Sequence, residues 1–164
     1  MDIKAIVDGL VRKYETRDPF AISAELGLIV LFKPLVDMRG FQCTLKRRKF
    51  IFINEELDER QQRLVCGHEL AHHLLHRGIN RIFMDHNTCY VMQKYENEAN
   101  YFSAELNYSD EELYPFLTRS VQDAAAYMGI PVEMARKRME SIPLTAPTPY
   151  GVGFPREANA SHLM

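Results

Sequence analysis

The segment 63–76 has the sequence RLVCGHELAHHLLH, which contains the pattern His-Glu-x-x-His. Its two histidines, His68 and His72, are four residues apart, so on a helix they share one face, with Cβ atoms roughly 6 Å apart. Two imidazoles placed in this way can bind one zinc ion at about 2.0–2.1 Å each. Glu69 lies one residue further round, where its carboxylate can accept a proton from a water molecule at the metal and pass it to a leaving amine. The segment therefore predicts a helix that carries a metal-dependent hydrolytic site.

The alternative is a surface helix with two exposed histidines. Apolar residues, however, lie all round the motif: Leu64, Leu70, Ala71, Leu74 and Leu75. Polar ring nitrogens among such side chains need partners, and a metal ion would provide them.

A catalytic zinc ion needs a third protein ligand and one open position. One class of metalloproteases extends the motif to His-Glu-x-x-His-x-x-Gly-x-x-His, but here Leu75 replaces the glycine and Gly78 the third histidine, so that class is excluded. The remaining candidates are glutamates of a later helix, Glu96, Glu98 and Glu105.

A ligating histidine usually donates its second N–H to an acceptor outside the metal site, and this criterion favours Glu96. Asn100 lies four residues after Glu96 on the same helix face, so one helix can supply both the ligand and the acceptor. Glu98 has only Phe102 at that spacing. We therefore predict that Glu96 is the third ligand and that Glu98 is a solvated helix charge.

The rest of the chain predicts an α+β fold with a small, antiparallel or mixed three-stranded sheet and a helical C-terminal part. Apolar periodicity, capping residues and β-branched runs are the signals used. Helices are expected over 3–14, from 18 to about 27, over 59–76 and 93–106, from 109, and over 120–128 and 131–141, with a strand over 28–32 and a hairpin of 37–45 with 49–54.

Residues 68–76 and 96–106, together with 18–22 and 50–54, resemble the ImmA/IrrE metallo-endopeptidases, and the resemblance covers roughly residues 3–140. The later half is most similar to the members of phages and mobile elements. In the family pattern E-x-x-A-[NDS] the first glutamate binds the metal, which matches Glu96. Many members continue with Leu-Leu-Met-Pro, where this chain has LNYS over 106–109.

The resemblance implies a gluzincin-type endopeptidase that binds Zn²⁺, with Mn²⁺ as an alternative. It also implies a protein substrate, a helix-turn-helix transcriptional repressor, whose cleavage would relieve repression of a phage, an integrative element or a stress response. We expect a protease core over 1–108, a helical subdomain over 109–141 and a flexible tail rich in Pro and Gly over 142–164.

Proteases often bind a peptide as an additional strand at the edge of a sheet. Because Phe50, Ile51, Phe52 and Ile53 lead towards the motif, we expect them to form that edge; the alternative is a hairpin within the core. The spacing assigns no residue that would stabilise an oxyanion, a role for which the candidates are His73, His76, His86, Tyr90 and Tyr101.

Composition constrains the other functions. Lys and Arg total 20 and Asp and Glu 22, a formal net charge of −2, which gives no overall reason to bind DNA or an anionic membrane. The three cysteines cannot all pair within the chain, and the longest apolar run is too short to cross a bilayer, so we expect a cytoplasmic protein with reduced thiols.

Two other functions stay open. Residues 120–141 could form a helix-turn-helix that contacts DNA through Arg136, Lys137 and Arg138, although packing between two helices explains the same pattern. The second alternative is a metal-stabilised protein that inactivates a repressor by binding, without cleavage.

Overall fold

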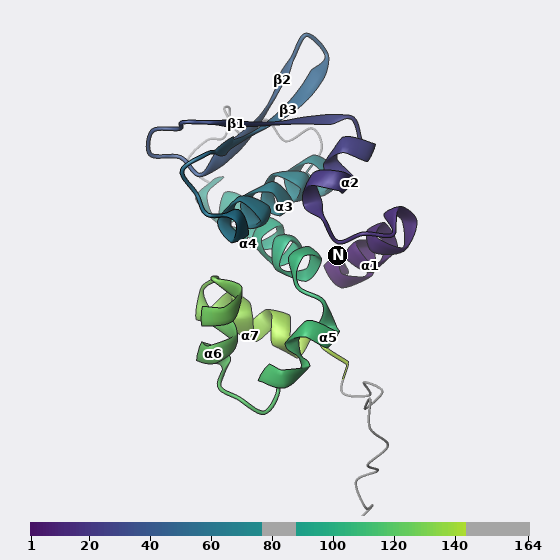
Figure 1. The fold of residues 1–164 in the computed structure, drawn as a ribbon, viewed down its shortest axis with the longest axis vertical. Helices are drawn as coiled ribbons and strands as arrows, with labels where there is room; N and C mark the ends of the chain where they lie inside the picture. Colours follow the sequence, from purple (N-terminus) through teal and green to yellow (C-terminus); the bar gives the residue numbers. More distant parts are fainter. Residues whose placement is uncertain (77–87, 144–164) are drawn as a thin grey trace, which may run out of the picture.

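The computed structural model describes residues 1–76 and 88–143, with the backbone alone for residues 88–91. In the described ranges a small sheet forms one end of the molecule, two long helices cross beneath it, and short helices form the other end (Figure 1), which confirms the α+β class. The elements are α1 (Ile3–Tyr14), α2 (Pro19–Glu25), β1 (Leu28–Lys33), β2 (Gly40–Leu45), β3 (Arg48–Asn54), α3 (Glu59–Leu75), α4 (Thr88–Asn107), α5 (Asp110–Leu113), the 3-10 helix η1 (Tyr114–Phe116), α6 (Val121–Met128) and α7 (Val132–Glu140).

The three strands of the described chain form a mixed sheet in the order β1-β3-β2. β3 is parallel to β1 and antiparallel to β2, so both of its edges are hydrogen-bonded. The prediction that Phe50, Ile51, Phe52 and Ile53 form an edge strand is therefore wrong.

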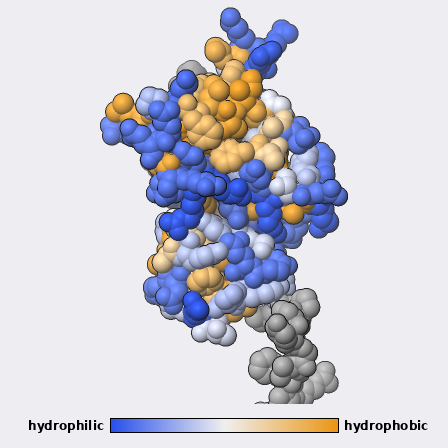
Figure 2. Space-filling model, viewed as in Figure 1, coloured by the Kyte–Doolittle hydropathy of each residue, from blue (hydrophilic) through white to orange (hydrophobic). Residues whose placement is uncertain are grey.

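The physical reason lies in the side chains of β3. Ile51 and Ile53 are fully buried in the core, whereas Phe50 and Phe52 on the opposite face are half-buried. The ring of Phe52 stacks with the rings of Phe50 and Phe41. A strand that is apolar on both faces is typical of the middle of a sheet. Figure 2 shows hydrophobic residues gathered at this end of the molecule.

The helix with the motif is anchored at its start and pressed against its neighbour in the middle. Asp58 and Gln61 form the capping box of α3, as the sequence predicted. Further along, Ser103 of α4 donates a hydrogen bond from Oγ to the carbonyl oxygen of Leu64 at 2.6 Å. A Cβ at Gly67 would lie 2.8 Å from Ser103 Oγ, so only glycine lets the two helices approach so closely here. This crossing fixes how residues of α4 face the histidines of α3.

The start of β2 lies directly on α3. A Cβ at Gly40 would be 2.4 Å from Cγ1 of Val65 and 2.8 Å from the carbonyl oxygen of Phe52. The glycine thus brings the outer strand of the sheet close to the helix that carries His68 and His72.

The helices α5, α6 and α7 surround a second hydrophobic cluster, which also contains Leu64 of α3 and Tyr108, the residue after α4. Gly129 ends α6 in the left-handed conformation, with φ 67°, and so allows the turn into α7. The boundary at 108/109 stays a prediction. Most of the predicted tail, residues 144–164, lies outside the described residues.

Among the described residues, no helix combines the length and the apolar character that crossing a membrane requires.

Candidate active site

The two motif histidines lie one helical turn apart on the face of α3 that looks towards α4. Their Nε2 atoms are 3.0 Å apart. Glu96 reaches them from α4, with one carboxylate oxygen 3.1 Å from Nε2 of His68 and the other 3.4 Å from Nε2 of His72. The structure thus brings Glu96, among the three glutamates considered, to the motif.

These three side chains have the donor set and the spacing of a zinc site. Their ligand atoms all lie within 4.8 Å of one another. Ligands at about 2.0–2.1 Å from a tetrahedral zinc ion are about 3.3 Å from each other, close to the separations found here. Imidazole and carboxylate are the usual ligands of catalytic zinc, so the residues fit the ion.

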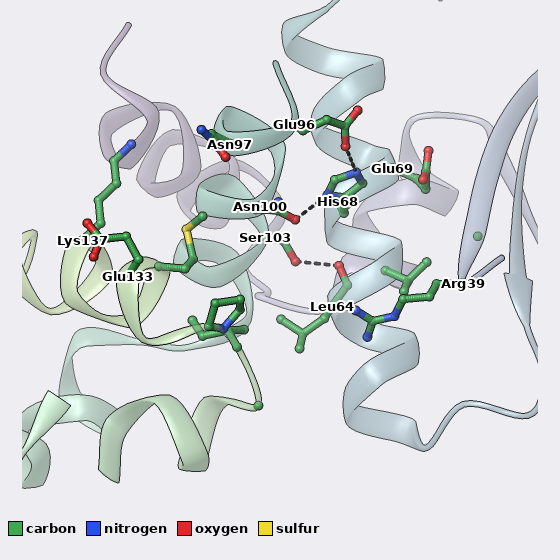
Figure 3. A pocket seen from close by; sticks show the side chains of 16 residues that line it. Arg39, Leu64, His68, Glu69, Glu96, Asn97, Asn100, Ser103, Glu133 and Lys137 are labelled. Carbon is green, nitrogen blue, oxygen red and sulfur yellow. Dashed lines mark hydrogen bonds and ion pairs between the residues drawn. The ribbon is translucent and has the colours of Figure 1, made fainter. Parts of the chain in front are cut away.

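Asn100 holds the ring of His68 in the required orientation. Nδ1 of His68 donates to Oδ1 of Asn100 over 2.8 Å, which leaves Nε2 with its lone pair on the side of Glu96 (Figure 3). The predicted contact is therefore present, and its effect on a metal ion stays a prediction.

Glu69 is buried, with 4% of its surface exposed, yet it lines the same cleft as His68. The cleft has a volume of about 680 Å³ and passes between two walls. Arg39 and Gly40 at the start of β2 belong to one wall, and Met134 and Lys137 of α7 belong to the other (Figure 3). A peptide that crossed the cleft would pass over His68 and Glu96.

Of the candidates for stabilising an oxyanion, His76 lies beside His72, whereas the other four contact residues elsewhere or lie outside the described part. His73 is buried, with Nδ1 3.3 Å from Nζ of Lys49 on β3. Tyr101 donates to Oε1 of the buried Glu105 at 2.7 Å, and burial raises the pKa of Tyr101 to about 12. His86 and the side chain of Tyr90 lie outside the described residues. The oxyanion role stays unassigned.

Sequence reasoning missed one pair beside the site. Nδ1 of His76 lies 2.8 Å from Nδ1 of His72, and Nε2 of His76 lies 3.0 Å from Oε2 of Glu98. The expectation that Glu98 is a solvated charge is therefore wrong, since its side chain is only 16% exposed and contacts a buried histidine. The four-residue spacing of His68, His72 and His76 was the available signal.

The basic residues of α7 are largely engaged within the protein. Arg138 is fully buried and pairs with Asp110 and Glu105. Lys137 lies over the ring of Tyr101, 4.5 Å from its centroid. Both contacts fit packing between helices, the alternative to DNA contact for residues 120–141.

Comparison with known proteins agrees with this site. The M78 peptidase family, described as the IrrE N-terminal-like domain, matches residues 23–140. An "uncharacterized immunity region protein 2" of Bacillus phage phi105 is 36% identical over 81% of this chain and 86% of its own length. The metallopeptidase ImmA of Bacillus subtilis is 27% identical over 79% of each chain. The chain therefore belongs to the M78 peptidase family, and its role is that of a metallopeptidase.

Proposed function

We propose that this protein is a zinc-dependent endopeptidase of the His-Glu-x-x-His type that cleaves a transcriptional repressor. The observation that carries the proposal is the convergence of His68, His72 and Glu96 at a cleft that Glu69 also lines. Mn²⁺ is the alternative ion, because carboxylate ligands also suit it.

Bound zinc would polarise the scissile carbonyl and lower the pKa of a water molecule to about 7. The carboxylate of Glu69 accepts a proton from the attacking water as the water oxygen bonds to the carbonyl carbon. Glu69 then gives this proton to the amide nitrogen as the C–N bond breaks, and so regains its charge. Asn100 keeps Nε2 of His68 directed at the site throughout.

We infer that the substrate pairs with β2, which replaces residues 50–53 as the candidate edge. In the described chain β2 pairs with β3 on one side, and its residue Gly40 borders the cleft. An extended peptide added to the other side of β2 would make main-chain hydrogen bonds and pass between this strand and α7.

We propose that the substrate is a helix-turn-helix repressor and that cleavage takes place in the cytoplasm. The immunity region named for the phage relative supports a substrate that acts in immunity control. Cys43 and Cys66 are both free thiols, which suits a reducing compartment.

The test is incubation of the purified protein with the repressor encoded beside its gene, read by mass spectrometry. Zinc-loaded protein should cut the repressor at one or a few bonds, a chelator should stop the reaction, and added zinc should restore it. An intact repressor after incubation with fully zinc-loaded protein would refute the proposed substrate.

The Glu69→Gln variant separates cleavage from inactivation by binding. It should keep its zinc and leave the repressor intact and able to bind its operator. If this variant still released the repressor from DNA, inactivation by binding would replace proteolysis as the function.

A further inference from the structure

We propose that His76 and Glu98 are positioning residues that orient and strengthen His72 as a metal ligand. The inference rests on the proposed metal site and concerns residues outside the three ligands. Its observation is a continuous chain of two contacts, 2.8 Å from His72 to His76 and 3.0 Å from His76 to Glu98.

With a metal ion bound at Nε2 of His72, the distances allow one arrangement of protons. Nε2 of His72 faces Glu96 and His68, so it carries the lone pair that would bind the ion, and Nδ1 carries the hydrogen. Nδ1–H of His72 then donates to Nδ1 of His76. The hydrogen of His76 is consequently on Nε2, where it donates to the carboxylate of Glu98.

Burial strengthens the effect of these two hydrogen bonds on His72. His72 is 3% exposed and His76 is 8% exposed, so water has little access to the nitrogens between them. The ring of Tyr95 packs against His76, with centroids 4.7 Å apart. A negative charge at the far end of a hydrogen-bonded chain in such surroundings increases the electron density on Nε2 of His72.

His68 and His72 therefore differ in the group that accepts the hydrogen bond from Nδ1–H. His68 donates to a neutral amide, Asn100, which is exposed. His72 donates through His76 to an ionised carboxylate, and charged acceptors form stronger hydrogen bonds than neutral ones. We expect His72 to be the more strongly held ligand of the pair.

The test measures zinc affinity of the full chain by competition with a chromogenic chelator. Glu98→Ala and His76→Phe should each weaken zinc binding by about 10–100-fold, the usual effect of removing such a partner. Glu98→Gln should have a smaller effect, because its amide oxygen still accepts from His76 while the charge is lost. Glu111→Gln, an exposed carboxylate on α5, is the matched control and should bind zinc as the wild type does.

Cobalt substitution gives a second readout. The visible absorption bands of bound Co²⁺ should shift in Glu98→Gln and remain unchanged in Glu111→Gln, since only the first change alters the electron density on a ligand. Circular dichroism of the metal-free proteins checks folding, and Glu98→Gln keeps the test valid if His76→Phe does not fold.

Two results would overturn the inference while leaving the metal site intact. One is zinc affinity within twofold of wild type in Glu98→Ala and His76→Phe, while His72→Ala loses binding. The other is a stoichiometry of two zinc ions per chain in the wild type that falls to one in His76→Phe. In that case His76 and Glu98 would form a metal site themselves. Unchanged zinc binding in His72→Ala would instead refute the proposed site, and the inference with it.

Discussion

The helix α4 carries two polar clusters of opposite character. Near its middle, Glu96 and Asn100 contact the motif histidines beside the cleft, and the side chain of Glu96 is 37% exposed. At its end, Glu105 is only 1% exposed and lies against Arg138 of α7. We call the first the cleft cluster and the second, with Lys4 and Asp110, the buried network.

The difference lies in where the compensating charge comes from. Glu105 has Arg138 at 3.4 Å and Lys4 at 3.8 Å, and both Tyr101 and Ser141 donate hydroxyl hydrogens to it. The buried network therefore contains its own cations, as buried charges require. In the cleft cluster, two imidazole rings and a carboxylate converge on one point, which is a ligand set for a metal cation. The buried network thus pairs its charges within the fold, whereas the cleft cluster presents metal-ligand atoms beside a cleft.

The sharpest test of this contrast is Glu69→Gln in the cleft. Removing the base should lower kcat/KM by about 10²–10⁴-fold while zinc content stays at one ion per chain. Glu111→Gln, which makes the same change on an exposed part of α5, should keep wild-type activity. A Glu69→Gln variant with more than a tenth of wild-type kcat/KM would remove Glu69 from the mechanism.

The buried network should show its effect in stability. Arg138→Ala leaves the carboxylate of Glu105 buried without its nearest cation, so the free energy of unfolding should fall by about 3–5 kcal/mol. Arg136→Ala is the control, because Arg136 is half-exposed and its partner Glu133 lies 3.9 Å away, and it should cost less than about 1 kcal/mol. Urea unfolding measures both. Equal losses would show that burial of the network contributes nothing.

Most of the cleft cluster can be predicted from the sequence. The motif fixes His68, Glu69 and His72 by local helix geometry, and the four-residue step from Glu96 to Asn100 gives the right choice of glutamate to face them, again by local geometry. The capping box of α3 and the turn at Gly129 are local as well.

What the sequence left out depends on segments that are distant along the chain. The parallel pairing of β1 with β3, which places β3 in the middle of the sheet, has no local signal, so the prediction of an edge at residues 50–53 is wrong. The contact between His76 and Glu98 exists only because α3 and α4 cross at Gly67. The buried network joins α1, α4, α5 and α7, and no spacing relates them.

The crossing that joins the two clusters can be tested at Gly67. In Gly67→Ala a Cβ would lie 2.8 Å from Oγ of Ser103 and 2.9 Å from Nδ2 of Asn107, so the helices must separate. We expect a loss of about 1–3 kcal/mol in the free energy of unfolding and weaker zinc binding, as Glu96 moves from the histidines. Gly9→Ala in α1, where the nearest atom is 4.0 Å away, should be neutral or slightly stabilising. If Gly67→Ala were less stable than the wild type but bound zinc with unchanged affinity, the crossing of α3 and α4 would not determine the geometry of the metal site.

The smallest expected effect is an acid dependence of the buried network through Asp110. Burial alone would raise the pKa of this carboxyl, but the hydrogen bonds from Lys4 at 2.9 Å and Arg138 at 2.7 Å outweigh it and hold the pKa below the usual 3.8. A group whose pKa is lower in the folded state stabilises the fold above its unfolded pKa and loses this contribution as the pH falls through the folded value.

Asp110→Asn should therefore be less stable than the wild type at pH 7, by on the order of 1 kcal/mol, because the amide still accepts one hydrogen bond. The gap should narrow as the pH falls below 3.8 and close once the pH is below the lower, folded-state pKa, where the wild-type carboxyl is protonated in both states. Urea unfolding at pH 7, 5, 4 and 3 measures the difference in the free energy of unfolding between the wild type and Asp110→Asn. Asp37→Asn, exposed and at a φ of 54° that asparagine tolerates, should show no gap at any pH. A gap of unchanged size from pH 7 to pH 3 would mean that the shape of the Asp110 side chain, rather than its charge, holds α5 to α7.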